Sequence, residues 1–268
     1  MVVDSATLFD ISTTQNNLPG KHECPVQILM EYLEFHPYDL LKQTFFKPMA
    51  SEFKWVVPDE EILPSGLIQL GETPDFSDEK FENLKDGLKH FYTMFWESKD
   101  AGHYFIAYNM AYDMRILNEH FMRILNDEPI SIPENGIIDV MMLAKKLIPV
   151  EKISSYTEKN VLVYLYGLPF LKKVSEKLTG SKLDSTITKF ILMAFCKQKG
   201  FNSFKEIHDF IVAPEILKVF PFGKYKGRNI KEIFENDKQY IDWMKTSSDI
   251  LEKNPDLKYT LDFLEGNG

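Results

Sequence analysis

The chain has 268 residues, of which 44% are hydrophobic and 13% aromatic, so it can bury a sizeable core and is not disordered in composition. Its 40 acidic residues outnumber its 31 basic residues, which gives a formal net charge of -9. This balance excludes nucleic-acid binding by bulk attraction, because neutralising phosphates requires Lys and Arg. We therefore expect a basic protein partner rather than nucleic acid.

The cysteines and the apolar segments of the sequence indicate the cellular compartment of the protein. Cys24 and Cys196 lie far apart without metal-ligand spacing, which is typical of a reducing compartment. The N-terminus lacks a charged-then-apolar signal pattern, and no apolar run approaches the roughly 20 residues that span a bilayer. We expect a soluble, cytoplasmic protein without a membrane partner.

The first half of the chain predicts strands before helices. Short apolar segments predict an antiparallel meander of three strands, at Thr7–Ile11, Pro25–Phe35 and Gln43–Lys47. Recurrent Pro and Gly residues make 48–78 loop-like. Apolar residues at helical spacing then predict a helix with Ser77 as its N-cap, and Tyr104–Tyr108 predicts another strand.

The second half alternates helices with one more strand. A strand is predicted at Gly136–Met141, ending at Asp139. Helical patterns are found at Ala111–Leu125, Leu143–Leu147, Glu158–Tyr166 and Ser185–Lys199. This element order predicts a mixed α/β fold.

A change of composition marks a boundary at Val212–Pro221, after which the chain turns basic. We predict one domain over residues 1–211 and a small C-terminal module over 212–268. The module contains helical patterns around Tyr240–Met244 and Leu257–Leu264.

Three segments place acidic residues where a strand ends or a helix begins. LFDISTT carries Asp10, FIAYNMAYDMRIL carries Asn109 and Asp113, and TGSKLDSTITKFIL carries Asp184. Together they resemble the three motifs of the DEDD 3′–5′ exonucleases, which read apolar-Asp-x-Glu-Thr-Thr, Asn-x-x-x-Asp and His-x-x-x-x-Asp. The segment FPFGKYKGRNIKEIFENDKQYIDWM is similar to the C-terminal module of the exodeoxyribonuclease X type.

The resemblance implies a ribonuclease H-like mixed sheet flanked by helices, with a small C-terminal appendage. It also implies a site for two divalent metals, one that activates water and one that stabilises the leaving oxygen. By the family pattern, the ligand positions are Asp10, 12, Asp113 and Asp184. Position 12 is Ser12, which cannot replace a carboxylate, and the position of the general-base histidine is Thr179.

These two departures predict a vestigial site. Loss of a general base alone typically costs about 10²–10⁴-fold in rate, and loss of a ligand weakens metal affinity further. We therefore expect no enzymatic activity, no bound metal and no cofactor. Asp184 can alternatively serve as the N-cap of a helix that begins at Ser185, and Asp4 or Glu176 are the acids considered as spatial substitutes for the missing ligand.

An acidic segment suggests how such a fold could act without catalysis. It contains seven acids that we predict to bind a basic partner: Asp59, Glu60, Glu61, Asp75, Asp78, Glu79 and Glu82. Size, acidity and the incomplete site are similar to those of acidic bacteriophage proteins that bind a host RNA degradosome. The resemblance implies a homodimer in the host cytoplasm that inhibits RNA degradation by covering the RNA-binding segments of an endoribonuclease.

Two alternatives stay open. The first is a metal-dependent 3′–5′ exonuclease with a rearranged site, which would require Mg²⁺ or Mn²⁺. The second is a noncatalytic nucleic-acid-binding subunit that uses the basic turn over residues 218–231.

Overall fold

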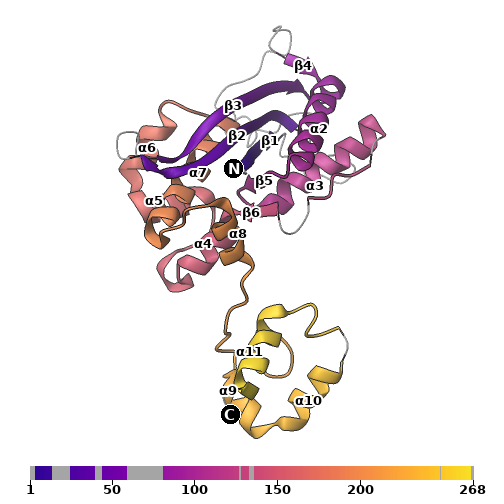
Figure 1. Cartoon of the computed structure of the whole chain (residues 1–268), viewed down its shortest axis with the longest axis vertical. Helices are drawn as coiled ribbons and strands as arrows, with labels where there is room; N and C mark the ends of the chain where they lie inside the picture. The colour runs from indigo at the N-terminus through magenta and orange to yellow at the C-terminus, as the bar shows by residue number, and fades with distance from the viewer. Residues whose placement is uncertain are drawn as a thin grey trace. The chain divides into compact units, whose positions relative to one another are not determined.

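The computed structural model describes residues 4–13, 25–39, 44–58, 81–126, 128–132, 136–247 and 249–266. It divides into two compact units, unit 1 over Met1–Ile211 and unit 2 over Val212–Gly268 (Figure 1). The division falls at Val212, the first residue of the boundary region over Val212–Pro221.

Unit 1 is built on a six-stranded mixed sheet with the strand order β4-β3-β2-β1-β5-β6. The first three strands form an antiparallel meander, β5 and β6 continue the sheet parallel to β1, and β4 pairs in parallel with β3. The strands are β1 (Ser5–Thr13), β2 (Pro25–Asp39), β3 (Thr44–Val57), β4 (Phe81–Asn83), β5 (Tyr104–Ala107) and β6 (Ile137–Asp139).

Helices cover both faces of the sheet (Figure 1). On one face lie α2 (Leu84–Asp100) and α3 (Met110–His120), which continues into a short π-helical turn over Phe121–Leu125. The other face is covered by α4 (Val140–Leu147), α5 (Glu158–Tyr166), α7 (Gly180–Lys199) and α8 (Phe204–Val212). A 3-10 turn over Val150–Lys152 and the helix α6 (Leu168–Ser175) complete this layer. Mixed sheet and helices together confirm the predicted α/β class.

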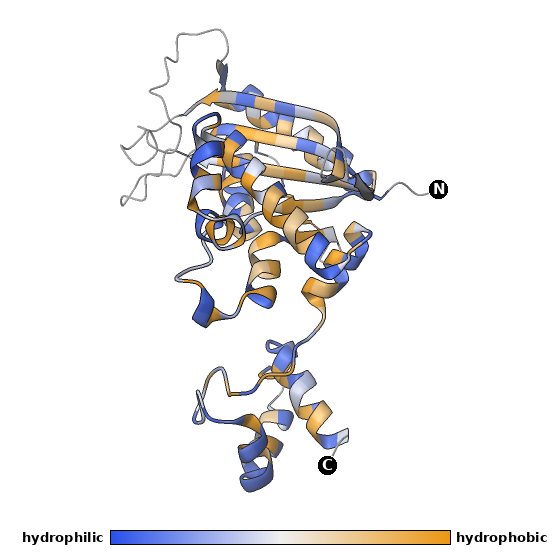
Figure 2. Cartoon of the chain, turned by 90° about the vertical axis from the view of Figure 1, so that its left-hand side faces the viewer, coloured by the Kyte–Doolittle hydropathy of each residue, from blue (hydrophilic) through white to orange (hydrophobic). Residues whose placement is uncertain are grey.

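The central strand β1 is buried on both faces. Because side chains alternate across a strand, its even-numbered and odd-numbered residues point to opposite faces of the sheet. Ala6 and Leu8 belong to the core under α5 and α7, whereas Phe9 and Ile11 belong to the core under α2 and α3. Figure 2 shows apolar segments along the strands and on the helices beside them. The even-numbered positions of β1, which include 10 and 12, therefore face the α5 and α7 layer.

Two predicted boundaries are wrong. Residues 48–57 are part of β3 rather than a loop, because Pro48 pairs with Leu33 beside a register shift, where a proline does not interrupt regular pairing. The first long helix begins at Leu84 rather than after Ser77, because Asn83 caps it by accepting a hydrogen bond from the Asp86 amide. Ser77 lies outside the described residues.

Unit 2 has a small core of its own, formed around Phe220, Ile230, Ile241, Met244 and Leu257. Its helices are α9 (Ile230–Asn236), α10 (Lys238–Thr246) and α11 (Pro255–Gly266). Among the described residues of both units, no helix is long and apolar enough to cross a bilayer.

Candidate functional site

Ser12 fastens β1 to α7. Its Oγ lies 3.0 Å from the Oγ of Ser181, in the first turn of α7, and both side chains are 0% exposed. The Ser181 amide donates to Oε1 of Gln27, which lies opposite Ser12 on β2, at 3.0 Å. Position 12 is thus enclosed by a hydrogen-bonded contact between the sheet and α7.

The start of α7 requires a glycine. Gly180 has φ +54°, and a Cβ there would stand 1.9 Å from Oε1 of Gln27. Because α7 begins at Gly180, Asp184 lies inside the helix, and the expected N-cap at Asp184 is wrong. Thr179 is the exposed N-cap residue and makes no side-chain capping bond.

Asp113 comes from the helix that follows β5. β5 runs parallel to β1, so the carboxyl ends of both strands meet at one edge of the sheet, where α3 begins. Asp113 stands in the first turn of α3 and is only 4% exposed. Residue 109 enters the helix with φ 63°.

Asp139, at the end of β6, holds this turn in place. Its carboxylate accepts hydrogen bonds at 3.1 Å from the amides of Asn109 and Met110 at the start of α3. The same carboxylate caps α4 by accepting from the amides of Met141 and Met142. Asp139 thus caps the N-termini of both α3 and α4, and by holding the start of α3 it positions Asp113.

A further carboxylate, Glu158, reaches this region from α5. Glu158 is the first residue of α5 and is partly buried, and the Thr188 hydroxyl donates a hydrogen bond to its carboxylate. Thr188 lies one helical turn after Asp184 on α7, so the two side chains share a face. Glu158 was not among the predicted site residues, because an acid in the first turn of a helix is common and carries no motif.

The four carboxylates act on one another electrostatically. Burial raises the pKa of Asp10 well above its usual value, and the negative charges of Asp184, Asp113 and Glu158 raise it further. Burial, and then the same two aspartates, likewise raise the pKa of Glu158. Oδ2 of Asp10 is buried and has no hydrogen-bond partner among the described residues. The site therefore brings acidic side chains near enough to one another for their charges to raise the pKa of Asp10 and of Glu158.

The chemistry of these side chains fits a hard divalent cation. All four donors are carboxylates, which suit Mg²⁺ and Mn²⁺, and a cation would satisfy the isolated oxygen of Asp10. As placed in the described part of the chain, however, no three acidic, histidine or cysteine side chains are close enough to share one ion. The two acids considered as substitutes lie elsewhere: Asp4 accepts from the Phe204 amide, and Glu176 is an exposed residue at the end of α6.

The predicted acidic docking surface falls mostly outside the described residues. This holds for Asp59, Glu60, Glu61, Asp75, Asp78 and Glu79. The seventh residue, Glu82, lies in β4 and forms an ion pair of 2.5 Å with Nζ of Lys54. Glu82 is therefore neutralised within the fold, and the surface as a whole stays a prediction.

The basic turn over residues 218–231 lies in unit 2 and joins an aromatic cluster. Nζ of Lys224 lies 4.6 Å from the ring centre of Tyr225 and 5.8 Å from that of Tyr240. The Tyr240 ring is in turn 5.6 Å from the ring of Trp243, whose side chain is 53% exposed. Cationic and aromatic groups therefore lie side by side on the surface of unit 2.

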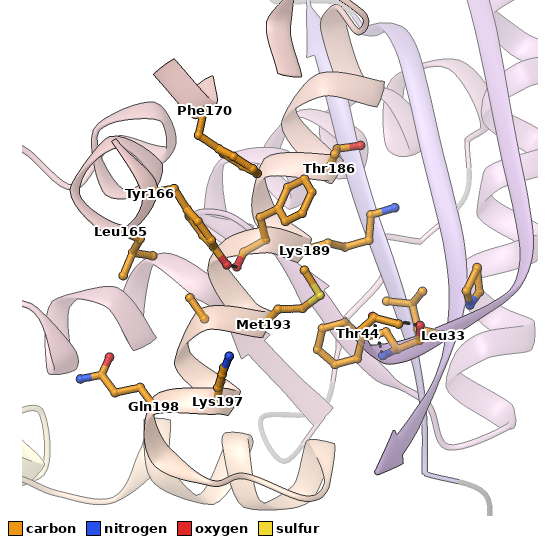
Figure 3. Close-up of a pocket in the computed structure, with 14 residues that line it drawn as sticks. Leu33, Thr44, Leu165, Tyr166, Phe170, Thr186, Lys189, Met193, Lys197 and Gln198 are labelled. Carbon is orange, nitrogen blue, oxygen red and sulfur yellow. Dashed lines mark hydrogen bonds between the residues drawn. The ribbon is translucent and has the colours of Figure 1, made fainter. Parts of the chain in front are cut away.

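A cavity of about 820 Å³ lies between α7, the ends of α5 and α6, and the strands β2 and β3 (Figure 3). One wall is an aromatic group in which the rings of Tyr166 and Phe170 stack at 4.8 Å. Lys189, on the opposite side, forms an ion pair of 2.6 Å with Glu31. None of the four carboxylates lines this cavity, so it is separate from the candidate site.

Comparison with known proteins relates the chain to exonucleases. Residues 220–249 match the family described as Exodeoxyribonuclease X-like C-terminal. Exodeoxyribonuclease 10 of Escherichia coli strain K12 is 24% identical over 233 residues, which cover 85% of this chain and 90% of that protein. Both likenesses support the resemblance to the DEDD exonucleases.

Solved structures show the same fold. Exonuclease I of E. coli, in complex with the oligonucleotide 5cy-dA13, has a TM-score of 0.53 at 15% identity over 77% of this chain. Exonuclease I from Methylocaldum szegediense has a TM-score of 0.51 at 14% identity, also over 77%. The chain spans 42% of the length of each of these two proteins. The predicted ribonuclease H-like fold is therefore confirmed.

These relatives overturn the prediction that the chain is not an enzyme. The curated relative and the structural neighbours are named exonucleases, which points to a nuclease. The expected absence of a cofactor does not fit this likeness either, because the resemblance to the DEDD exonucleases implies a site for two divalent metals. The prediction gave too much weight to Ser12 and Thr179, since the substitutes that it considered, Asp4 and Glu176, did not include Glu158.

Proposed function

We propose that this chain is a metal-dependent 3′–5′ exonuclease with a rearranged site, acting on DNA. The observation that carries the proposal is the buried Oδ2 of Asp10, which has no hydrogen-bond partner among the described residues and feels the charges of Asp113 on α3 and Asp184 on α7. Its curated relative over 85% of the chain is named an exodeoxyribonuclease, which supports DNA as the substrate.

Three elements of unit 1 supply the metal-holding residues in this proposal. Asp10 on β1, Asp113 on α3 and Asp184 on α7 would hold Mg²⁺ or Mn²⁺. When bound, such ions activate a water molecule and stabilise the leaving oxygen of the scissile phosphodiester. Hydrolysis would release a mononucleotide and leave a chain shortened by one nucleotide.

Turnover should be slow in comparison with relatives that carry a histidine. Thr179 has no group that accepts a proton near neutral pH, and its side chain is exposed at the start of α7. An enzyme without a positioned general base typically loses about 10²–10⁴-fold in rate. The proposal therefore predicts measurable cleavage only at high enzyme concentration or long incubation.

The test is cleavage of a single-stranded DNA oligonucleotide labelled at its 5′ end. We expect a ladder that shortens from the 3′ end with Mn²⁺ or Mg²⁺ and no cleavage with EDTA. Asp10→Asn should abolish the ladder, whereas Glu176→Gln, an exposed acid on α6, should leave it unchanged. A ladder that persists in Asp10→Asn would indicate a contaminating nuclease and count against the proposal. A matched RNA oligonucleotide measures the preference for DNA.

The inhibitor function predicted from acidity is not retained. It required an inactive fold, whereas the relatives of this chain are named exonucleases. Its docking surface also loses Glu82 to the ion pair with Lys54.

A further inference from the structure

Position 12 is closed to a carboxylate in this fold. Ser12 is 0% exposed and is hydrogen-bonded to Ser181, whose amide is in turn hydrogen-bonded to Gln27. A glutamate there would bury an additional charge beside Asp10 and would have to displace the contact that fastens α7 to the sheet. A fourth acidic ligand therefore has to come from another element.

One face of α7 shows which element that is. Ser181, Asp184 and Thr188 follow one another at spacings of three and four residues, so they line one face of the helix. Ser181 contacts Ser12 at one end of this row, and Thr188 holds Glu158 at the other. Asp184 stands between them. Glu158 thus approaches Asp184 from the side opposite to position 12.

We propose that Glu158 is the fourth metal-holding carboxylate of this site and replaces the one that Ser12 has lost. The inference rests on the proposed function, since it assigns a residue to the same cation. One further observation supports it: the buried Oδ2 of Asp10 has no hydrogen-bond partner among the described residues.

Thr188 has a positioning role in this arrangement. Its hydroxyl donates to one oxygen of Glu158, which fixes the carboxylate beside Asp184 and leaves the second oxygen for an ion. Such outer partners orient ligands and typically change metal affinity by about 10–100-fold when they are removed.

A purely structural role for Glu158 predicts a different outcome. An acid in the first turn of a helix stabilises that helix, and a hydrogen bond to Thr188 could serve only to join α5 to α7. Glu158→Gln separates the two roles, because the amide oxygen can still accept from Thr188 while the charge is lost. If Glu158 has only a structural role, Glu158→Gln should lower the melting temperature slightly and leave the Mn²⁺ affinity unchanged.

The experiment is a Mn²⁺ titration of the full chain by calorimetry, compared with the rise in melting temperature on adding Mn²⁺. Glu158→Gln should weaken Mn²⁺ binding by at least about tenfold, the lower end of the cost of losing even an outer partner. Glu176→Gln is the matched control and should bind Mn²⁺ as the wild type does. Thr188→Val should weaken binding less than Glu158→Gln, and it provides a second reading if the latter is unstable.

The outcomes separate the inference from the proposed function. Equal Mn²⁺ affinity in Glu158→Gln and Glu176→Gln would overturn the inference, even if the wild type cleaves DNA. Mn²⁺ binding that depends on Glu158, without any DNA cleavage, would support the inference and overturn the proposed function. If the wild type shows no Mn²⁺ binding beyond that of Asp10→Asn, both the inference and the proposed function are overturned.

Discussion

Ser12 and Ser181 join the end of the central strand to the first turn of α7 through hydroxyl groups 3.0 Å apart. The bond crosses 169 residues of sequence and is completely buried. It turns a position that the family pattern reserves for a ligand into a structural contact.

Removing either hydroxyl should therefore lower stability. Ser12→Ala and Ser181→Ala should each cost about 1 kcal/mol of unfolding free energy, the typical net value of a buried hydrogen bond. Because both remove the same bond, the double variant should cost less than the sum of the two. Urea denaturation of the four proteins measures this coupling, and strict additivity would show that the two hydroxyls do not interact.

Gly180→Ala should be more damaging than its small size suggests. The new methyl group would meet Oε1 of Gln27, and φ +54° is unfavourable for alanine. Gly200→Ala is the matched control, because Gly200 has φ +74° and nothing within 4 Å of the added carbon. We expect Gly180→Ala to cost at least about 1 kcal/mol more than the control, since overpacking typically costs 1–3 kcal/mol. Equal denaturation midpoints would contradict the close approach of Gln27.

The stability of the metal-free protein should fall as pH rises. Asp10 is protonated in both states below its usual pKa of 3.8, so it then contributes nothing. Above that pH, Asp10 ionises in the unfolded chain but stays protonated in the folded protein, because its folded-state pKa is raised. The folded state therefore loses stability as the pH rises, until the pH reaches that raised pKa. Asp10→Asn removes the effect, so its melting temperature should exceed that of the wild type by a margin that grows with pH.

Thermal melts in EDTA at a series of pH values check this. Comparing the two proteins cancels the titrating groups outside the site, and a margin of about 2–4 °C corresponds to 1 kcal/mol. Adding Mn²⁺ should close the gap at high pH by stabilising the wild type alone. A margin that is independent of pH would mean that the Asp10 charge is already compensated in the folded state.

Asp139→Ala should affect cleavage from a distance. The carboxylate accepts from amides at the start of both α3 and α4, so its loss leaves several amides without their acceptor. We expect a cost of about 2 kcal/mol, at the upper end for a capping residue. The rate of DNA cleavage should fall as well, because the turn that carries Asp113 loosens. Unchanged cleavage by the folded variant would show that α3 is fixed by packing alone.

The basic turn of unit 2 should contact a single-stranded substrate. Trp243→Ala should weaken binding by about tenfold, because stacking of one base on an aromatic ring is worth 1–3 kcal/mol. Lys226→Ala should reduce the salt dependence by about 0.7 in log–log slope, the value for one phosphate contact on a single strand.

Fluorescence anisotropy with labelled oligonucleotides in EDTA measures both effects without cleavage. Phe263→Ala and Lys258→Ala, at exposed positions on α11, are the matched controls. If all four variants bind alike, the aromatic and cationic cluster of unit 2 is not a nucleic-acid contact.

Local signals made part of the site predictable. Asp10 interrupts a run of buried strand residues, and Asp113 stands in the first turn of an amphipathic helix, so both positions follow from short segments. Glu158 did not, because its relation to the site depends on Thr188, 30 residues further on. The start of α7 was also missed, because a Thr-Gly-Ser sequence is typical of a turn unless Gln27 is known to stand opposite it.

The fold shows the same division between local and distant causes. Alternation and helical spacing sufficed for the meander and for most of the helices on both faces, but not for β4, α6 or α8. The extension of β3 through Pro48 did not follow from its own sequence, because it depends on the register of β2, which places Leu33 opposite the proline.

Glu158 lies at the start of a helix rather than within a strand, and this affects how related chains can be recognised from their sequences. A helix start accepts a new acid readily, whereas the middle of a sheet seldom does. Two independent substitutions could thus relocate a carboxylate across the site without disturbing the backbone. Searches that demand every acid at its ancestral position would discard such chains as inert, whereas a search by spatial proximity would retain them.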